Sequence, residues 1–157
     1  MNQLNMSKIK TLPALKRIVK ELKAKNKRVV FTNGCFDILH PGHIKILKDS
    51  KSKGDILVVG LNSDSSIRRI KGKTRPVMDE KARSKVLEAI EFVDFIVIFN
   101  EDTPYEAIKE LKPDYLVKGE DWKADKIIGK EFVKKIFRIK FYPGYSTTGI
   151  IKKIKNG

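Results

Sequence analysis

Two histidines that lie close together are the residues of this sequence best suited to chemistry. His40 and His43 are its only histidines, and Pro41-Gly42 separates them at the start of a helical pattern. Residues three apart at a helix entry lie on one side, so both imidazoles can contact one anion. A zinc site is one alternative, but it needs further ligands, and Cys35 is the only cysteine. Incidental polar residues at a helix cap are the other alternative.

The segment before the histidines favours phosphate as that anion. The apolar run Val29–Phe31 is typical of the end of a buried strand, and the polar turn Thr32-Asn33-Gly34 follows it. A helix is predicted to begin near Gly42. A strand, a glycine turn and a helix start together present backbone N–H groups and the positive end of a helix dipole to a phosphate.

A second group of hydroxyl-bearing residues lies near the C-terminus. Ser146, Thr147 and Thr148 precede a helical pattern predicted for residues 149–155. Serine and threonine cap helices in any protein, which is the purely structural interpretation. Donors at a helix start also form a phosphate cradle, so these residues are candidates for a second phosphate contact.

Further candidates follow the predicted strands, because ligands of open α/β sheets bind at the carboxyl ends of strands. The strand predicted at 56–61 ends in a polar turn. The basic segment 68–75 is expected to be a loop whose lysines neutralise phosphates, although an ordinary solvated loop is the alternative. An arginine on the helix predicted from residue 79 either reaches the site or is exposed. These candidates are Asn62, Asp64, Lys71, Lys73 and Arg83.

The elements that must position these groups alternate between strand and helix. Strands are predicted at 28–31, 56–61, 93–99, 115–118 and 139–142. Helices are predicted from 11 to before 26 and at 42–53, 79–91, 105–111 and 149–155, with a short helical or irregular crossover at 126–135. The buried face of the helix at 79–91 is expected to hold Ala82, Val86, Leu87 and Ile90.

This alternation predicts an α/β fold, a doubly wound Rossmann-like parallel sheet of about five strands with helices on both faces. Residues 1–27 are expected to form a leader helix packed on the domain of residues 28–157, with residues 1–7 frayed. The dinucleotide fingerprint GxGxxG is absent, so the first turn is not of the NAD type.

Length and composition fit one soluble globular domain. The chain has 157 residues with 41% hydrophobic content, and its apolar runs are too short to cross a bilayer. Met1–Lys8 has no continuous apolar core, so no signal peptide is expected. A single cysteine excludes an internal disulfide framework. Together these features predict a cytoplasmic protein with no membrane partner.

The formal charge of +15 allows two interpretations. It can mark a nucleic-acid-binding surface, or it can reflect lysines spread over solvated helix faces. The lysines occur along the whole chain without an arginine-rich block, and aromatic residues are not interleaved with them at stacking intervals. Attraction of triphosphates and sugar phosphates is a sufficient use for the charge, so nucleic acid is not the expected partner.

Six sequence blocks in order resemble a known family. The blocks are NGCFDILHPGH, NSD, KGKTRPV, EDTP, LKPDYLVKGEDW and STTGIIKKI, and the resemblance runs from about residue 10 to residue 154. They resemble the adenylyltransferase domain of ADP-heptose synthesis, within the HxGH nucleotidyltransferase superfamily related to the cytidylyltransferases. HxGH alone is only moderately specific. The resemblance implies an enzyme that joins ATP and D-glycero-β-D-manno-heptose 1-phosphate into ADP-heptose and pyrophosphate, a step in carbohydrate metabolism that serves lipopolysaccharide.

The resemblance also implies roles for individual residues. His40, His43 and Lys45 are the expected catalytic residues, and Mg²⁺ is expected to accompany the triphosphate without a dedicated protein metal site. A homodimer is implied as well, with the sugar kinase of the pathway on a separate chain. The residues expected to bind the nucleotide are Asn33, Gly34, Cys35, Phe36, His40, His43, Gly119, Asp121, Trp122, Ser146, Thr147 and Thr148.

Two other functions remain open at this level. A CTP-dependent transferase acting on glycerol or ribitol phosphate also suits Lys45 and the GEDW block at residues 119–122. A basic nucleotide- or nucleic-acid-binding module without turnover is the alternative that is not an enzyme. Release of pyrophosphate distinguishes the three functions, because only the two transferases produce it and they differ in the nucleotide consumed.

Overall fold

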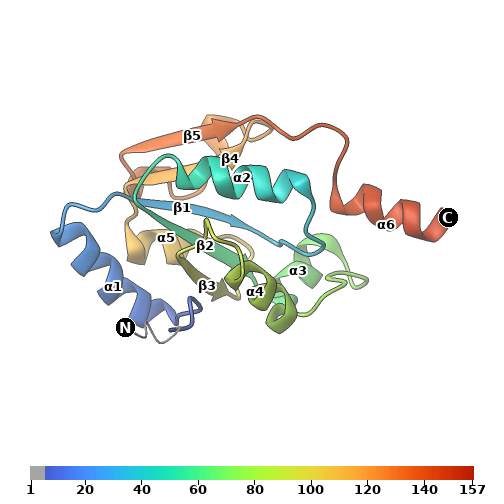
Figure 1. Cartoon of the computed structure of the whole chain (residues 1–157), viewed down its shortest axis with the longest axis horizontal. Coiled ribbons are helices and arrows are strands. Elements are labelled where there is room, and N and C mark those ends of the chain that lie inside the picture. The colour runs from blue at the N-terminus through green and yellow to red at the C-terminus, as the bar shows by residue number, and fades with distance from the viewer. Residues whose placement is uncertain (1–5) are drawn as a thin grey trace.

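A parallel five-stranded sheet forms the centre of the protein. The computed structural model of the chain describes residues 6–157 (Figure 1). Every neighbouring pair of strands is parallel, in the order β3-β2-β1-β4-β5. The fold predicted from the sequence is therefore confirmed. The strands are β1 (Val29–Gly34), β2 (Ile56–Asn62), β3 (Phe95–Phe99), β4 (Tyr115–Gly119) and β5 (Lys135–Ile139).

The strand order places a topological switch at the centre of the sheet. The chain moves outward from β1 through β2 to β3, and then returns to the other side of β1 as β4. Connections that leave β1 and β4 therefore diverge, which opens a crevice at the carboxyl ends of these two strands.

Four helices cover the two faces of the sheet. The helices α1 (Leu12–Ala24) and α5 (Tyr105–Leu111) share one core cluster with residues of β1 and β2. The helices α2 (Pro41–Lys51) and α4 (Glu80–Glu88) contribute Leu47 and Leu87 to the cluster on the opposite face. Continuous apolar strands are thereby buried on both sides, as a parallel sheet requires.

The remaining elements lie at the edges. The helix α3 (Asp64–Lys71) follows β2 directly, and short 3₁₀ turns η1 (Ala124–Lys126) and η2 (Lys130–Phe132) connect β4 to β5. The last helix, α6 (Thr147–Asn156), has no buried residue and extends away from the sheet (Figure 1). Among the described residues, no helix combines the length and apolar character needed to cross a membrane.

Hydroxyl and carboxylate side chains set the starts of several helices. Thr11 accepts a hydrogen bond from the backbone N–H of Ala14 at the start of α1, and Ser63 accepts one from Ser66 at the start of α3. Asp79 caps α4 in the same way. Each cap satisfies a backbone donor that the helix itself cannot pair.

Two predicted segments are wrong. Residues 68–71, expected to be a loop, form the second half of α3. The cap at Ser63 starts this helix, whose mostly polar sequence does not show the apolar spacing of a helix. The fifth strand ends at Ile139 instead of covering 139–142, because its pairing with β4 aligns Gly119 with Ile139. Phe141 and Tyr142 consequently lie outside the sheet, where both are exposed.

Smaller differences concern single side chains. Val86, expected on the buried face of α4, is 39% exposed, and Arg83 occupies the interior in its place. The fraying expected for residues 1–7 lies mostly outside the described residues. Ser7, which is described, donates a hydrogen bond of 2.6 Å to Glu88 and is therefore held against α4.

Candidate active site

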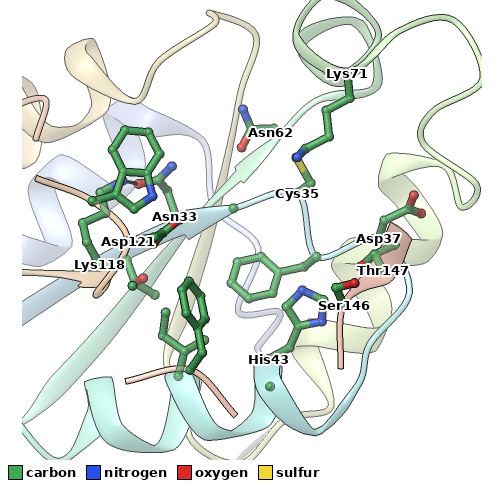
Figure 2. A pocket seen from close by; sticks show the side chains of 18 of the residues that line it. Asn33, Cys35, Asp37, His43, Asn62, Lys71, Lys118, Asp121, Ser146 and Thr147 are labelled. Carbon is green, nitrogen blue, oxygen red and sulfur yellow. Dashed lines mark hydrogen bonds between the residues drawn. The ribbon is translucent and has the colours of Figure 1, made fainter. Parts of the chain in front are cut away.

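A cleft of about 600 Å³ opens at the carboxyl ends of β1 and β4. Groups from the start of α2, from the turn after β4 and from the start of α6 line it together (Figure 2). The histidine pair and the hydroxyl-bearing residues Ser146–Thr148 therefore share one cleft, although about a hundred residues separate them in the sequence.

His40 is fixed by the helix that it starts. Its Nδ1 accepts a hydrogen bond of 3.1 Å from the N–H of Gly42, so the imidazole is the N-cap of α2, with Pro41 at the first helical position. A neutral ring that accepts at Nδ1 carries its proton on Nε2, which remains free to donate. A Cβ on residue 42 would lie 2.8 Å from Cε1 of His40, so this approach requires glycine.

His43 stacks against His40 and is buried more deeply. The two ring centroids are 3.8 Å apart with an interplanar angle of 29°, and the ring of Phe36 lies 5.3 Å from His43 on another side. Burial, followed by the neighbouring His40, lowers the pKa of His43 to about 4. Both rings are therefore neutral hydrogen-bonding groups near pH 7, since burial lowers the pKa of His40 as well.

The start of α6 forms the other side of the cleft. Ser146 is the N-cap, and its Oγ accepts a hydrogen bond of 3.0 Å from the N–H of Gly149. Because the serine oxygen is engaged by the cap, the first N–H groups of the helix and the hydroxyls of Thr147 and Thr148 are the donors left for a ligand.

A buried carboxylate holds the loop beside the histidines. Asp37 accepts hydrogen bonds from the N–H groups of Val77 and Met78 and from Arg75 Nε at 3.0 Å. The pKa of Asp37 is lowered: burial opposes ionisation, and the donors from Met78, Val77 and Arg75 outweigh it. Its oxygens are thus occupied by the protein, and Arg75 is held at the edge of the cleft.

Most of the residues predicted for the site line the cleft, and four do not. Lys45 forms an ion pair with Asp49 on its own helix, one turn away. Lys73 and Asp64 also lie outside the cleft lining. The residues predicted for the site that line the cleft are Asn33, Gly34, Cys35, Phe36, His40, His43, Asn62, Lys71, Gly119, Asp121, Trp122, Ser146, Thr147 and Thr148.

Arg83 has a structural position instead of the predicted substrate contact. It is 1% exposed, and its guanidinium donates to the carbonyl oxygens of Cys35, Asn62 and Met78 and pairs with Asp64 at 2.8 Å. It therefore ties the ends of β1 and β2 to the start of α4 and to α3. A charged residue one turn before Leu87, on the buried face, is the sequence signal for this position.

Lys118 is a residue of the cleft that the sequence did not single out. It is 7% exposed at the end of β4, its Nζ donates to Oδ1 of Asn33, and the ring of Trp122 lies 5.2 Å away. Burial lowers the pKa of Lys118 to about 8, partly opposed by Asp121. A lysine within an otherwise apolar strand was the signal available.

The described residues provide no cage for a metal ion. Residues 6–157 contain no group of three or more histidine, cysteine, aspartate or glutamate side chains placed to hold one. The carboxylate of Asp37, the nearest acidic group to the histidines in sequence, is already saturated by hydrogen bonds.

Comparison with known proteins gives matches over most of the chain. Residues 31–153 match the model of the family described as cytidylyltransferase-like. The Bifunctional protein HldE of Geotalea uraniireducens is 51% identical over 155 residues, which are 96% of this chain and 32% of that protein. The HldE protein of Sulfurimonas denitrificans is 53% identical over 147 residues, 94% of this chain and 31% of that protein. The chain thus spans about a third of these relatives.

Two solved structures have similar folds. The lipopolysaccharide core biosynthesis protein from Thermoplasma volcanium superposes with a TM-score of 0.64 at 38% identity, over 74% of this chain and 98% of that one. The pantoate-beta-alanine ligase from Francisella tularensis, solved with beta-gamma ATP and beta-alanine, gives a TM-score of 0.66 at 17% identity, over 94% of this chain and 76% of the ligase. The second likeness concerns the fold alone.

Proposed function

We propose that this chain, which belongs to the cytidylyltransferase-like family, transfers the adenylyl group of ATP to a heptose 1-phosphate. The products are ADP-heptose and pyrophosphate. The six sequence blocks that resemble the adenylyltransferase domain of ADP-heptose synthesis support this choice of substrates, as do the identities near 50% to the HldE proteins.

One observation carries the proposal. The histidine pair at the start of α2 and the hydroxyl-bearing start of α6 line the same cleft. Two helix N-termini that point into one cleft supply backbone donors and positive dipole ends from two sides. A triphosphate is an anion with the length and charge to use both.

The reaction itself needs positioning more than covalent help. An oxygen of the heptose phosphate attacks the α-phosphorus of ATP in line, the bond to the β-phosphate breaks, and pyrophosphate leaves. The barrier arises from bringing two anions together and from charge that builds at the α-phosphate. Donors that are already oriented toward this charge lower the barrier without reorganisation.

The histidines are suited to that task because they are neutral and fixed. In this proposal Nε2–H of His40, oriented by the hydrogen bond from Gly42, donates to a phosphate oxygen. His43, stacked beneath it, contacts the α-phosphate in the transition state. Thr147 and Thr148 bind the β- and γ-phosphates, which leave as pyrophosphate.

Nearby groups of the cleft complete the proposed assignment. Asn62 lies at the end of β2 and Lys71 at the end of α3, where the acceptor phosphate would enter. Gly119, which lines the cleft at the end of β4, is proposed to border the base and ribose. A Cβ there would lie 2.8 Å from Oδ1 of Asp121 and 3.0 Å from the ring of Phe141, so glycine lets these two side chains pack against its backbone.

Magnesium is proposed to enter with the nucleotide. The cleft does not fit a protein-held ion, because the described residues offer no ligand cluster and Asp37 is engaged by Arg75 and the N–H groups of the loop. Triphosphate oxygens and water are ligands that Mg²⁺ prefers, so the ion can be carried by the substrate.

A pyrophosphate-release assay tests the proposal. The chain is incubated with ATP, CTP, GTP or UTP, each with heptose 1-phosphate, glycerol 3-phosphate or ribitol 5-phosphate. Release with ATP and the heptose phosphate is the expected result. Release only with CTP and a polyol phosphate would assign a different transferase, and no release with any pair would exclude turnover of these substrates.

A further inference from the structure

We propose that Lys118 and Asn33 form a phosphate-binding pair on the floor of the cleft, at the point where the α-phosphate of the nucleotide and the phosphate of the acceptor meet. The inference rests on the proposed function for the identity of these two phosphates. The pair itself is inferred from the position and the unmet charge of Lys118.

The ammonium of Lys118 is buried with little to compensate it. The side chain is 7% exposed, and its one hydrogen-bond acceptor within the described residues is the neutral amide oxygen of Asn33. An ammonium has three donors, so two of them have no protein acceptor in this arrangement. Burial of a charge is costly unless the charge is paired, which favours an anionic ligand at this position.

The other cations at the cleft have different surroundings. Arg75 is already neutralised by Asp37 at 3.0 Å. Lys71 and Lys140 are exposed at the edges of the cleft and remain well solvated. Lys118 is therefore the buried cation of the cleft lining whose charge the protein leaves open to a ligand.

The charged groups that act on Lys118 are few. Asp121, in the turn after β4, raises its pKa, but less than burial lowers it, and the resulting value is about 8. On β1 the facing group is Asn33, which has no charge. The segment after β5 contributes Lys140 to the same cleft, and α2 contributes His43. An incoming phosphate would thus be the strongest nearby negative charge.

The location of the pair fits a phosphate between two subsites. Asn33 ends β1 and Lys118 ends β4, the two strands that flank the switch point of the sheet. Figure 2 shows both side chains together with Asp121 on one side of the cleft, while Asn62 and Lys71 lie along another and Ser146 lies near His43. In this arrangement Lys118 reaches a phosphate from a different side of the cleft than the histidines and α6 do.

The chain provides a probe for this subsite. Trp122 is its only tryptophan, and its ring lies 5.2 Å from Nζ of Lys118. Intrinsic fluorescence therefore reports binding beside Lys118 without any need for turnover. This readout keeps the inference testable even if the chain turns over none of the tested substrates.

The experiment compares three variants in the full chain. Lys118→Met removes the charge at similar length, and Lys118→Arg keeps the charge. Lys109→Met is the matched control, because Lys109 also lies over an aromatic ring, that of Tyr105 at 5.9 Å, but outside the cleft. Thermal unfolding of each variant confirms that it is folded. Fluorescence titrations use a non-hydrolysable ATP analogue, heptose 1-phosphate, heptose and inorganic phosphate, and KM is measured for both substrates.

Loss of a hydrogen-bonded charge is expected to weaken phosphate binding roughly 10- to 100-fold in Lys118→Met. Lys118→Arg is expected to recover most of that loss, and Lys109→Met is expected to match wild type. A raised KM for heptose 1-phosphate alone would assign Lys118 to the acceptor phosphate, and a raised KM for ATP alone would assign it to the nucleotide. Either result supports the pair.

Two outcomes would overturn the inference. One is a folded Lys118→Met variant whose affinities and KM values equal those of Lys109→Met. The other is an equal loss of affinity for heptose and for heptose 1-phosphate, which would mean that Lys118 contacts hydroxyl groups and not phosphate. Should Lys118→Met fail to fold, Asn33→Asp replaces it. The new carboxylate neutralises Lys118 in place, and unchanged phosphate binding would then reject the pair.

Discussion

The buried position of His43 predicts a specific dependence of stability on pH. Burial beside His40 lowers the pKa of His43 in the folded protein to about 4, whereas the ordinary value is 6.5. In the unfolded chain the imidazole regains its ordinary pKa. At a pH between these two pKa values, the imidazole of the unfolded state binds a proton that the imidazole of the folded state does not.

The sign of the effect follows from that difference. Stability contributed by neutral His43 is complete above pH 6.5 and is lost as the pH falls toward 4. The two pKa values differ by about 2.5 units at about 1.36 kcal/mol each, which gives an upper limit of about 3 kcal/mol. Between pH 7 and pH 5 the expected loss is roughly 2 kcal/mol, because part of the titration lies outside this window.

Urea unfolding of wild type and His43→Gln at pH 7 and pH 5 measures this loss. The difference in the free energy of unfolding between the two proteins cancels the carboxylates that titrate in both. Wild type is expected to lose about 2 kcal/mol more than the variant on going to pH 5. His40→Gln, which leaves most of the burial of His43 in place, is expected to retain most of the dependence. A difference between wild type and His43→Gln that stays constant within about 0.5 kcal/mol would refute the assigned environment.

Three further results are expected. Thr147→Val should weaken binding of ATP roughly 3- to 10-fold, the value of one hydrogen bond, with AMP affinity near wild type; isothermal titration that shows an unchanged ratio of ATP to AMP affinity would refute the contact of Thr147 with the β- and γ-phosphates. Lys118→Met should stabilise the fold by roughly 1 kcal/mol, because it removes a buried ammonium, and in a chain of this size that free energy raises Tm by about 2–4 °C. An unchanged or lower Tm in thermal unfolding would contradict a costly burial of the Lys118 charge. Asp37→Asn should lower the free energy of unfolding by about 3 kcal/mol, since Arg75 and the loop N–H groups lose a charged acceptor; urea unfolding that shows a loss below about 1 kcal/mol would argue against that anchor.

The strands β1 to β4 could be predicted from the sequence because each contains an apolar run that ends in polar or glycine residues. The start of α2 could be predicted as well. His40 caps the helix, Pro41 fixes φ at the first helical position, and Gly42 lets the backbone approach the His40 ring closely. The end of β5 could not be placed in this way. Its limit at Ile139 is set by pairing with β4, and Phe141 continues the apolar run without pairing.

Side-chain roles that depend on tertiary contacts could not be predicted from the sequence either. The sequence places Arg83 on the same helix face as Leu87 and Lys118 in an apolar strand, but it does not show what faces them. The structure surrounds Arg83 with carbonyl oxygens and Asp64, which makes it a structural tie. It places Lys118 beside one neutral amide in an open cleft, which makes it a ligand candidate. The different partners of these two charged side chains therefore decide that one is structural and the other is a ligand candidate.

In the proposed reaction, two stacked imidazoles and the start of α6 hold one triphosphate for attack at its α-phosphorus. Pyrophosphate release from ATP and heptose 1-phosphate by wild type and by His43→Ala tests it most directly. Turnover is expected to fall on the order of 10²–10³-fold in the variant while its fold is retained, because a donor to the transition state is lost. Near-normal turnover by a folded His43→Ala protein would contradict a contact of His43 with the α-phosphate in the transition state.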